Sequence, residues 1–155
     1  MKIAAEIQIA SSSQDLPSES DIEDWIRETL CEGGRDRAEL TIRVVDEEEI
    51  TSLNSRYRHC NSPTDVLAFP HQLPGEIETD LLGDVVVCAG VVNEQAIKYQ
   101  VDRQAHWARI IAHGILHLLG FDHEQPQSTL VMETAESAIL SRLGLRHPEL
   151  HGHAS

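Results

Sequence analysis

The chain has 155 residues and a mass of 17.3 kDa, a length typical of one domain. Hydrophobic residues make up 41% of it and charged residues 25%, which is a globular composition and excludes a disordered chain. With 12 Lys and Arg against 26 Asp and Glu, the formal net charge is −14, which excludes nucleic-acid binding through bulk positive charge. A polyanionic partner must therefore be bound locally, by a few arginines or by a metal ion.

The N-terminal segment lacks the pattern of a signal peptide, because Glu6 and Gln8 interrupt its apolar residues. No run approaches the roughly 18 apolar residues that cross a membrane. The three cysteines, Cys31, Cys60 and Cys88, are an odd number without CxxC spacing, so no disulfide framework is expected. These features predict a protein of the reducing cytoplasm.

The first third of the chain predicts a strand, a helix and a second strand. Alternating apolar residues indicate strands over 2–9 and 38–45. Between them, a capping box of Ser20 and Glu23 predicts the start of a helix, and a glycine pair predicts its end. The apolar face of this helix consists of Ile22, Trp25, Ile26, Thr29 and Leu30.

A second helix is expected after Asp46, which with Glu49 has the residue types of a helix cap. Its inner face is predicted to consist of Ile50, Leu53 and Tyr57. A turn then leads to a short strand over 66–69, which Pro70 ends, and a loop follows over 71–80.

The second half predicts one buried strand followed by helices. Residues 81–88 are apolar except for Asp84, which is typical of a central strand covered on both faces. Three helices are expected at about 91–99, 103–119 and 127–143, of which the second is apolar nearly all round.

Together these elements favour an α+β fold over an α/β one. We expect a single domain over 1–150, with a tail at 151–155. Its mixed sheet should have about four strands and pack with about five helices, and the buried central helix should carry the candidate metal ligands.

Three histidines have the spacing of metal ligands. His113 and His117 lie one helical turn apart, about 40° around the axis, so both imidazoles can reach one ion. His123 would point away on a continuous helix, but Gly120 is placed to end the helix and let the chain fold back. Three protein ligands leave a fourth position open for water, which is the pattern of a catalytic zinc site.

The spacing H-x-x-x-H-x-x-G-x-x-H is also that of the metzincin zinc proteases. Those enzymes have Glu directly after the first histidine as general base, whereas this chain has Gly114. The geometry of a zinc hydrolase is therefore expected without the base that cleaves peptides, and a protease is disfavoured.

Three motifs occur in order: LNSRYRHCNSPTDVLAFP at 53–70, LLGDVVV at 81–87 and HGILHLLGFDH at 113–123. With these motifs the chain strongly resembles the YbeY family of single-domain, metal-dependent endoribonucleases. The resemblance implies one zinc ion held by His113, His117 and His123, and a catalytic role for Arg58. It further implies a cytoplasmic enzyme acting on small-subunit ribosomal RNA, notably in 16S rRNA 3′ end maturation and in ribosome quality control, with the ribosome or ribosome-associated proteins as partners.

The general base is not identified from the sequence. Asp84, Asp122 and Glu124 are candidates, and Asp122 is the better candidate for orienting a metal-bound histidine. His106 lies two turns before His113 and is expected either near the cleft or on the helix surface. A local positive patch is expected from Arg56, Arg58, Arg103 and Arg109.

Two other functions stay open at this point. The chain can be a metal-dependent hydrolase of another phosphoester or an amide, or a non-enzymatic ribosome-associated factor with a structural metal. A structural zinc would need a fourth protein ligand, for which Cys60, Cys88, His59 and Asp84 are the candidates. Three imidazoles also accept nickel or copper, so zinc is the expected metal and not an assured one.

Overall fold

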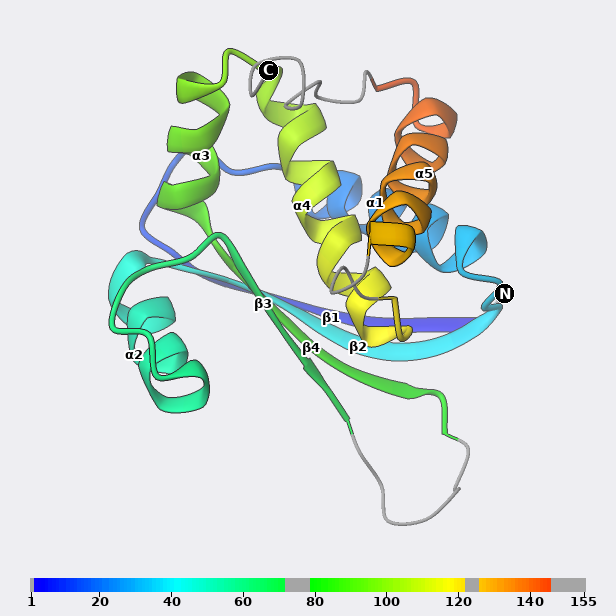
Figure 1. Ribbon diagram of the computed structural model, residues 1–155, viewed down its shortest axis with the longest axis horizontal. Helices are drawn as coiled ribbons and strands as arrows, with labels where there is room; N and C mark the ends of the chain where they lie inside the picture. The colour runs from blue at the N-terminus through cyan, green and yellow to red at the C-terminus, as the bar shows by residue number, and fades with distance from the viewer. Residues whose placement is uncertain (1, 72–78, 122–125, 146–155) are drawn as a thin grey trace.

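The computed structural model describes residues 2–71, 79–121 and 126–145 (Figure 1). The predicted α+β class is confirmed, and each predicted strand and helix is present with small shifts in its boundaries. The elements within these residues are β1 (Lys2–Ala10), α1 (Glu19–Glu32), β2 (Arg37–Val45), α2 (Glu47–Arg58), β3 (Val66–Pro70), β4 (Leu81–Cys88), α3 (Ala89–Lys98), α4 (Arg103–Leu118) and α5 (Pro126–Arg142).

The four strands form one mixed sheet in the order β1-β2-β4-β3. Strands β1, β2 and β4 are parallel, and β3 pairs antiparallel with β4 at the edge. Strand β4 is therefore an interior strand, and its side chains from Leu82 on are buried on both faces except for the exposed Asp84. This confirms the expectation drawn from its continuous apolar run.

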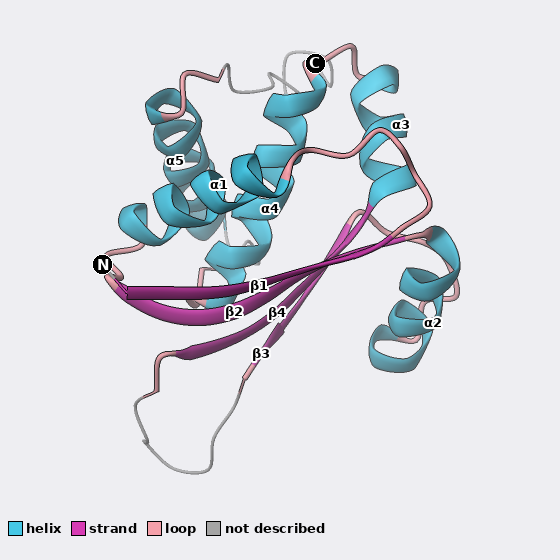
Figure 2. Cartoon of the chain, turned by 180° about the vertical axis from the view of Figure 1, so that it is seen from behind, coloured by secondary structure: helices cyan, strands magenta, loops and turns pink. Residues whose placement is uncertain are grey.

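Helices α1, α3, α4 and α5 lie on one side of the sheet and α2 lies on the other (Figures 1 and 2). Successive residues of a strand point to opposite faces, so β4 contributes to two separate cores. Val85 and Val87 join the large core beneath α1 and α4. Val86 and Cys88 join the small core with Ile50 of α2.

Helix α4 is the central helix of the molecule. It contacts strands β3 and β4 as well as helices α1, α3 and α5, and most of its side chains are buried. The carboxylate of Asp102 begins the helix by accepting a hydrogen bond from the Ala105 N–H at 2.9 Å. The prediction of a buried central helix is confirmed.

Three local predictions were wrong in whole or in part. The cap of α1 is Ser18, whose hydroxyl accepts from the Asp21 N–H at 3.0 Å, and not Ser20. Asp46 does occupy the predicted N-cap position of α2, but its side chain does not cap the helix, because its carboxylate accepts hydrogen bonds from Ser11 and Ser12 instead.

Tyr57 does not face the core, as 57% of it is exposed. Its ring packs edge-on against Phe69 of β3, with 5.1 Å between ring centroids. Asn54 is the buried residue on this last part of α2.

All three cysteines are free thiols, as expected. No helix among the described residues is long and apolar enough to span a membrane.

Candidate active site

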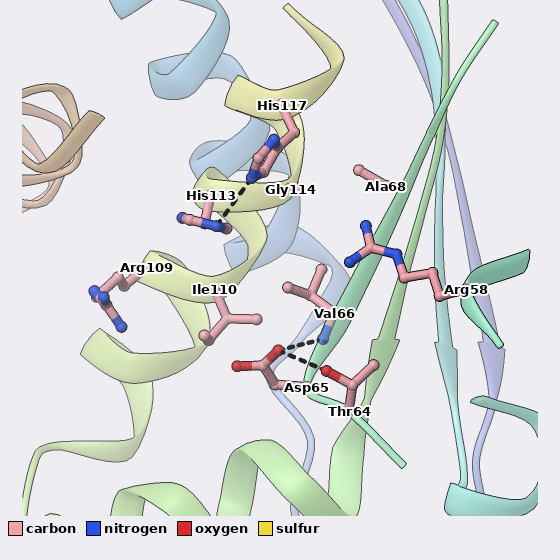
Figure 3. A pocket seen from close by; sticks show the side chains of 10 residues that line it. All are labelled: Arg58, Thr64, Asp65, Val66, Ala68, Arg109, Ile110, His113, Gly114 and His117. Atoms are coloured by element: carbon pink, nitrogen blue, oxygen red, sulfur yellow. Dashed lines mark hydrogen bonds between the residues drawn. The ribbon is translucent and has the colours of Figure 1, made fainter. Parts of the chain in front are cut away.

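His113 and His117 lie one turn apart on α4 and face the same cavity (Figure 3). Their Nε2 atoms are 3.2 Å apart. Two imidazole nitrogens bound to one tetrahedral zinc, each at about 2.0–2.1 Å, lie about 3.3 Å from one another. The observed separation is compatible with two ligands of a single ion, and the assignment of this pair as metal ligands stays a prediction.

Helix α4 ends where the ligand motif requires it to end. Gly120 has a φ of 100°, a conformation that side chains rarely adopt, and the chain turns there. His123, Asp122 and Glu124 follow this turn and lie outside the described residues. Among residues 2–71, 79–121 and 126–145, no group of three or more His, Cys, Asp or Glu side chains is placed to hold a metal. The third ligand therefore stays a prediction.

Glu136 of α5 orients the first of these histidines. Its Oε2 lies 2.8 Å from Nδ1 of His113, and its side chain is only 1% exposed. A carboxylate only accepts hydrogen bonds, so Nδ1 of His113 carries the proton and Nε2 is the unprotonated ring nitrogen. That tautomer is the one that binds a metal through Nε2, and a carboxylate partner of this kind is common at zinc sites.

The carboxylate of Glu136 also forms an ion pair with Arg109. Oε1 of Glu136 lies 3.2 Å from Nε of Arg109, which is one helical turn before His113. Glu136 was missed in the sequence because it lies 23 residues from His113 on another helix. A weak signal existed, since Glu136 falls on the apolar face of α5 beside Met132, Ala135 and Ile139. A charged residue on such a face needs a buried partner.

The cavity in front of the two histidines has a volume of about 250 Å³. One wall comes from α4, the opposite wall comes from the start of β3, and the end of α2 contributes Arg58 (Figure 3). The described residues that line it are Arg58, Thr64, Asp65, Val66, Ala68, Arg109, Ile110, His113, Gly114 and His117.

Arg58 is the last residue of α2, and its side chain extends past β3 toward the α4 wall (Figure 3). The helix ends because His59 adopts a left-handed conformation with a φ of 59°. The amide of Asn54, which is buried, donates to the Ser62 carbonyl oxygen at 2.9 Å and so fixes the loop that follows. The structure thus brings Arg58, known from the sequence only through a resemblance, to the same cavity as His113 and His117.

The predicted positive patch is present only in part. Arg109 lines the cavity together with Arg58. Arg103 instead pairs with Asp15 at 3.4 Å, and Arg56 does not line the cavity. Two arginines therefore supply the positive charge of this site within the described residues.

Gly114 has a packing reason for lacking a side chain. A Cβ atom there would lie 2.6 Å from Cγ1 of Val85 and 3.2 Å from Cγ2 of Val66. Helix α4 approaches the sheet too closely for the glutamate that metzincins carry at this position. The expectation that the peptide-cleaving base is absent thus has a structural cause.

Comparison with known proteins identifies the family and the fold of the chain that forms this cavity. The family model described as endoribonuclease YbeY matches residues 6–144. The chain belongs to the YbeY endoribonuclease family. The solution structure of TM1509 from Thermotoga maritima is similar over 88% of this chain and 91% of that one, with 24% sequence identity and a TM-score of 0.59. At this identity the likeness shows a shared fold.

The YbeY assignment makes the chain an enzyme, and so the carboxylates near the cavity are of interest. Asp84 is not among them, because it lies on the sheet face opposite Val85, which packs against α4. As a candidate base in this cavity, Asp84 is thus a wrong prediction. Asp65, which directly precedes β3, lines the cavity instead, and the sequence pattern did not single it out.

His106 of this YbeY chain is neither in the cavity nor on the helix surface, since it is only 1% exposed. Its Nε2 lies 2.8 Å from Oε1 of Gln95 on α3. Burial and, to a smaller extent, the charge of Arg109 lower the pKa of His106 to about 4, whereas Asp65 opposes the shift. His106 is therefore a neutral, buried imidazole at physiological pH.

The candidates for a fourth protein ligand do not approach the histidine pair. Cys88 is buried in the small core beneath α2, on the far side of the sheet. His59 and Cys60 are exposed beyond the end of α2 and, like Asp84, do not line the cavity. Within the described residues, the YbeY cavity thus has no additional ligand of the kind that a structural zinc site requires.

Proposed function

We propose that the chain is a zinc-dependent endoribonuclease that cleaves single-stranded RNA in the maturation of the 16S rRNA 3′ end and in ribosome quality control. Membership of the YbeY family supports the activity. The observation that carries the proposal is the placement of Arg58 in one cavity with the paired Nε2 atoms of His113 and His117. A metal ion and a phosphate group can be bound side by side there.

One zinc ion would be held by His113, His117 and His123. When bound, zinc lowers the pKa of a coordinated water and polarises a phosphoryl oxygen. Arg58 then binds the phosphate through its planar guanidinium, which forms two parallel hydrogen bonds to phosphate oxygens and stabilises the charge gained in the transition state. Arg109, whose side chain is 21% exposed, lies on the opposite wall, where its charge is paired with that of Glu136.

The charge distribution supports a locally bound, negatively charged substrate. The whole chain has a net charge of −14, yet two arginines lie at the cavity. The net charge of the chain would repel RNA, so a phosphate group must be bound locally, and the arginines that line the cavity can do this. We place the reaction in the cytoplasm, on small-subunit ribosomal RNA and in contact with the ribosome or ribosome-associated proteins.

The test measures zinc content and ribonuclease activity together, on the wild-type protein, Arg58→Ala and His117→Ala. The substrate is a precursor fragment that spans the 3′ end of the small-subunit RNA. Arg56→Ala serves as the matched control, because Arg56 lies on the same turn of α2 but does not line the cavity.

We expect the wild type and Arg56→Ala to hold one zinc ion and cleave. Arg58→Ala should keep the zinc and lose cleavage, whereas His117→Ala should lose both. Cleavage that persists in both active-site variants would come from a contaminant and contradict the proposal. A protein that holds zinc and hydrolyses a generic phosphoester in preference to this RNA would favour the broader hydrolase function.

A further inference from the structure

Asp65 is a carboxylate whose direction in the cavity is set by three hydrogen-bond donors. Its Oδ1 accepts from the Val66 N–H at 2.7 Å and from the Thr64 hydroxyl at 3.4 Å. Its Oδ2 accepts from the side-chain amide of Gln95 at 3.3 Å. These donors come from the chain around β3 and from α3, so Asp65 is held from two sides.

Gln95 is itself fixed by His106. Because its amide nitrogen donates to Asp65, its oxygen is the atom that faces Nε2 of His106 at 2.8 Å. Nε2 of His106 must then carry the proton and donate. His106 is 1% exposed and neutral, so this orientation is protected from water and from a change of charge near pH 7. The two hydrogen bonds thus run in one direction: His106 of α4 donates to Gln95 of α3, and Gln95 donates to Asp65.

Asp65 keeps capacity for one further donor. A carboxylate has about four acceptor sites, and three donors are in place within the described residues. It is also the one described residue lining the cavity with a negative charge, whereas Arg58 and Arg109 are positive. A phosphate is attracted to the arginines and repelled by Asp65, so the group that meets Asp65 must be a hydrogen-bond donor.

We propose that Asp65 accepts a hydrogen bond from the ribose 2′-hydroxyl of the nucleotide whose 3′-phosphate lies against Arg58. Within a nucleotide, the 2′-hydroxyl is the donor next to the 3′-phosphate, and the base amino groups lie farther away. It is present with all four bases, and a deoxyribonucleotide lacks it. Asp65 is then the residue that distinguishes RNA from DNA. This inference rests on the proposed function and adds to it the residue that determines sugar specificity.

The test uses cytidine 3′-monophosphate and 2′-deoxycytidine 3′-monophosphate, which carry the phosphate and differ only in the 2′-hydroxyl. Both are phosphomonoesters, so an endonuclease leaves them intact. Dissociation constants are measured by NMR chemical-shift titration of the zinc-loaded protein, and the same spectra show whether each variant is folded. The proteins are the wild type, Asp65→Ala, Asp65→Asn and Asp24→Asn, an exposed residue of α1 that lies outside the cavity.

The wild type and Asp24→Asn are expected to bind the ribonucleotide roughly tenfold more tightly than the deoxynucleotide, since a hydrogen bond to a charged group has this effect. Asp65→Ala should bind both equally. Asp65→Asn keeps an acceptor for the Val66 N–H and should show a ratio of about threefold or less, because its hydrogen bond is uncharged. This second variant decides the outcome if Asp65→Ala does not fold.

Equal binding of the two nucleotides by the wild type would overturn the proposal, as would an unchanged ratio in Asp65→Asn. RNA cleavage is measured in parallel on the same samples. If the wild type cleaves RNA but does not distinguish the nucleotides, the inference on Asp65 fails and the proposed function stands. If the zinc-loaded wild type does not cleave RNA, the proposed function itself fails, whatever the nucleotide ratio.

Gln95 is a positioning residue in this proposal, and Gln95→Leu tests it. The substitution removes the amide that joins His106 to Asp65 while keeping a side chain of similar size. We expect the ribonucleotide preference to fall to between those of the wild type and Asp65→Ala, with the deoxynucleotide affinity unchanged. Weaker binding of both nucleotides by the same factor would indicate a merely structural role and count against positioning.

Discussion

Glu136 of α5 accepts a hydrogen bond from Nδ1 of His113 on α4 at 2.8 Å, with its carboxylate only 1% exposed to solvent. This contact joins the C-terminal helix to the candidate metal site. It also selects the tautomer of His113 in which Nε2 is the unprotonated nitrogen, as metal binding through Nε2 requires. The orientation and tautomer of His113 therefore depend on a buried residue that does not line the cavity.

Replacing Glu136 with Gln should weaken zinc binding by roughly 10–100-fold, because the uncharged amide orients the imidazole less firmly and makes it a weaker ligand. Competition with a chromogenic chelator measures this affinity. Glu133→Gln, an exposed change on the same helix, is the control and should bind zinc as the wild type does. Equal affinities in the two variants would show that Glu136 does not support the ligand.

Arg58→Lys should keep zinc at the wild-type level but reduce kcat/KM by roughly 100-fold. Lysine retains the positive charge but lacks the planar pair of donors that matches a phosphate. Steady-state cleavage of a fluorescent single-stranded RNA measures the effect. Full activity in Arg58→Lys would mean that charge alone is needed at the end of α2.

Gly114→Ala should lower the free energy of unfolding by about 1–2 kcal/mol. The added methyl group would overlap Val85, and this overpacking outweighs the better helix propensity of alanine. Urea denaturation followed by circular dichroism gives the value. Ser137→Ala on the exposed side of α5 gains propensity without a clash, so it should be neutral or slightly stabilising.

The buried His106 should make stability fall in mild acid. Its pKa in the folded state is about 4, below the unfolded value of 6.5, so the unfolded chain binds more protons between these two pH values. Stability is fully present above pH 6.5 and is lost as the pH falls toward 4, with a slope of at most about 1.4 kcal/mol per pH unit from this group. Thermal unfolding of the wild type and His106→Gln from pH 7 to pH 4 should show a smaller loss in the variant.

The juxtaposition of the two histidines and the helix that carries them were predictable from the sequence, because both depend on local spacing. His113 and His117 need only the pitch of a helix, and Gly120 needs only its own freedom to adopt a positive φ. The strands followed in the same way from alternating or continuous apolar residues. Local patterns also caused the errors, since Ser18 and Ser20 have the same capping chemistry and only the fold selects one.

The groups around the ligands were not predictable, because they come from tertiary contacts. Glu136 reaches His113 from a helix 23 residues away, and Gln95 reaches Asp65 across 30 residues. The strand order β1-β2-β4-β3 puts β3 at the edge, where Asp65 just before it lines the cavity, and the face of β4 that packs against α4 carries Val85 and not Asp84. The strand order cannot be inferred from the periodicity of apolar residues in the sequence.

Helix α5 is also fastened at its far end, where Arg142 pairs with Glu28 at 2.9 Å and Glu32 at 2.8 Å on α1. Docking of α5 and metal occupancy are thereby linked, because undocking the helix withdraws Glu136 from His113. Thermodynamic reciprocity requires that an ion at the histidines hold α5 in place by the same free energy that the docked helix adds to ion binding. The rate of amide hydrogen exchange along α5 therefore reports metal occupancy without any substrate. High salt weakens the Arg142 ion pairs, so it should raise both this exchange rate and the zinc dissociation constant.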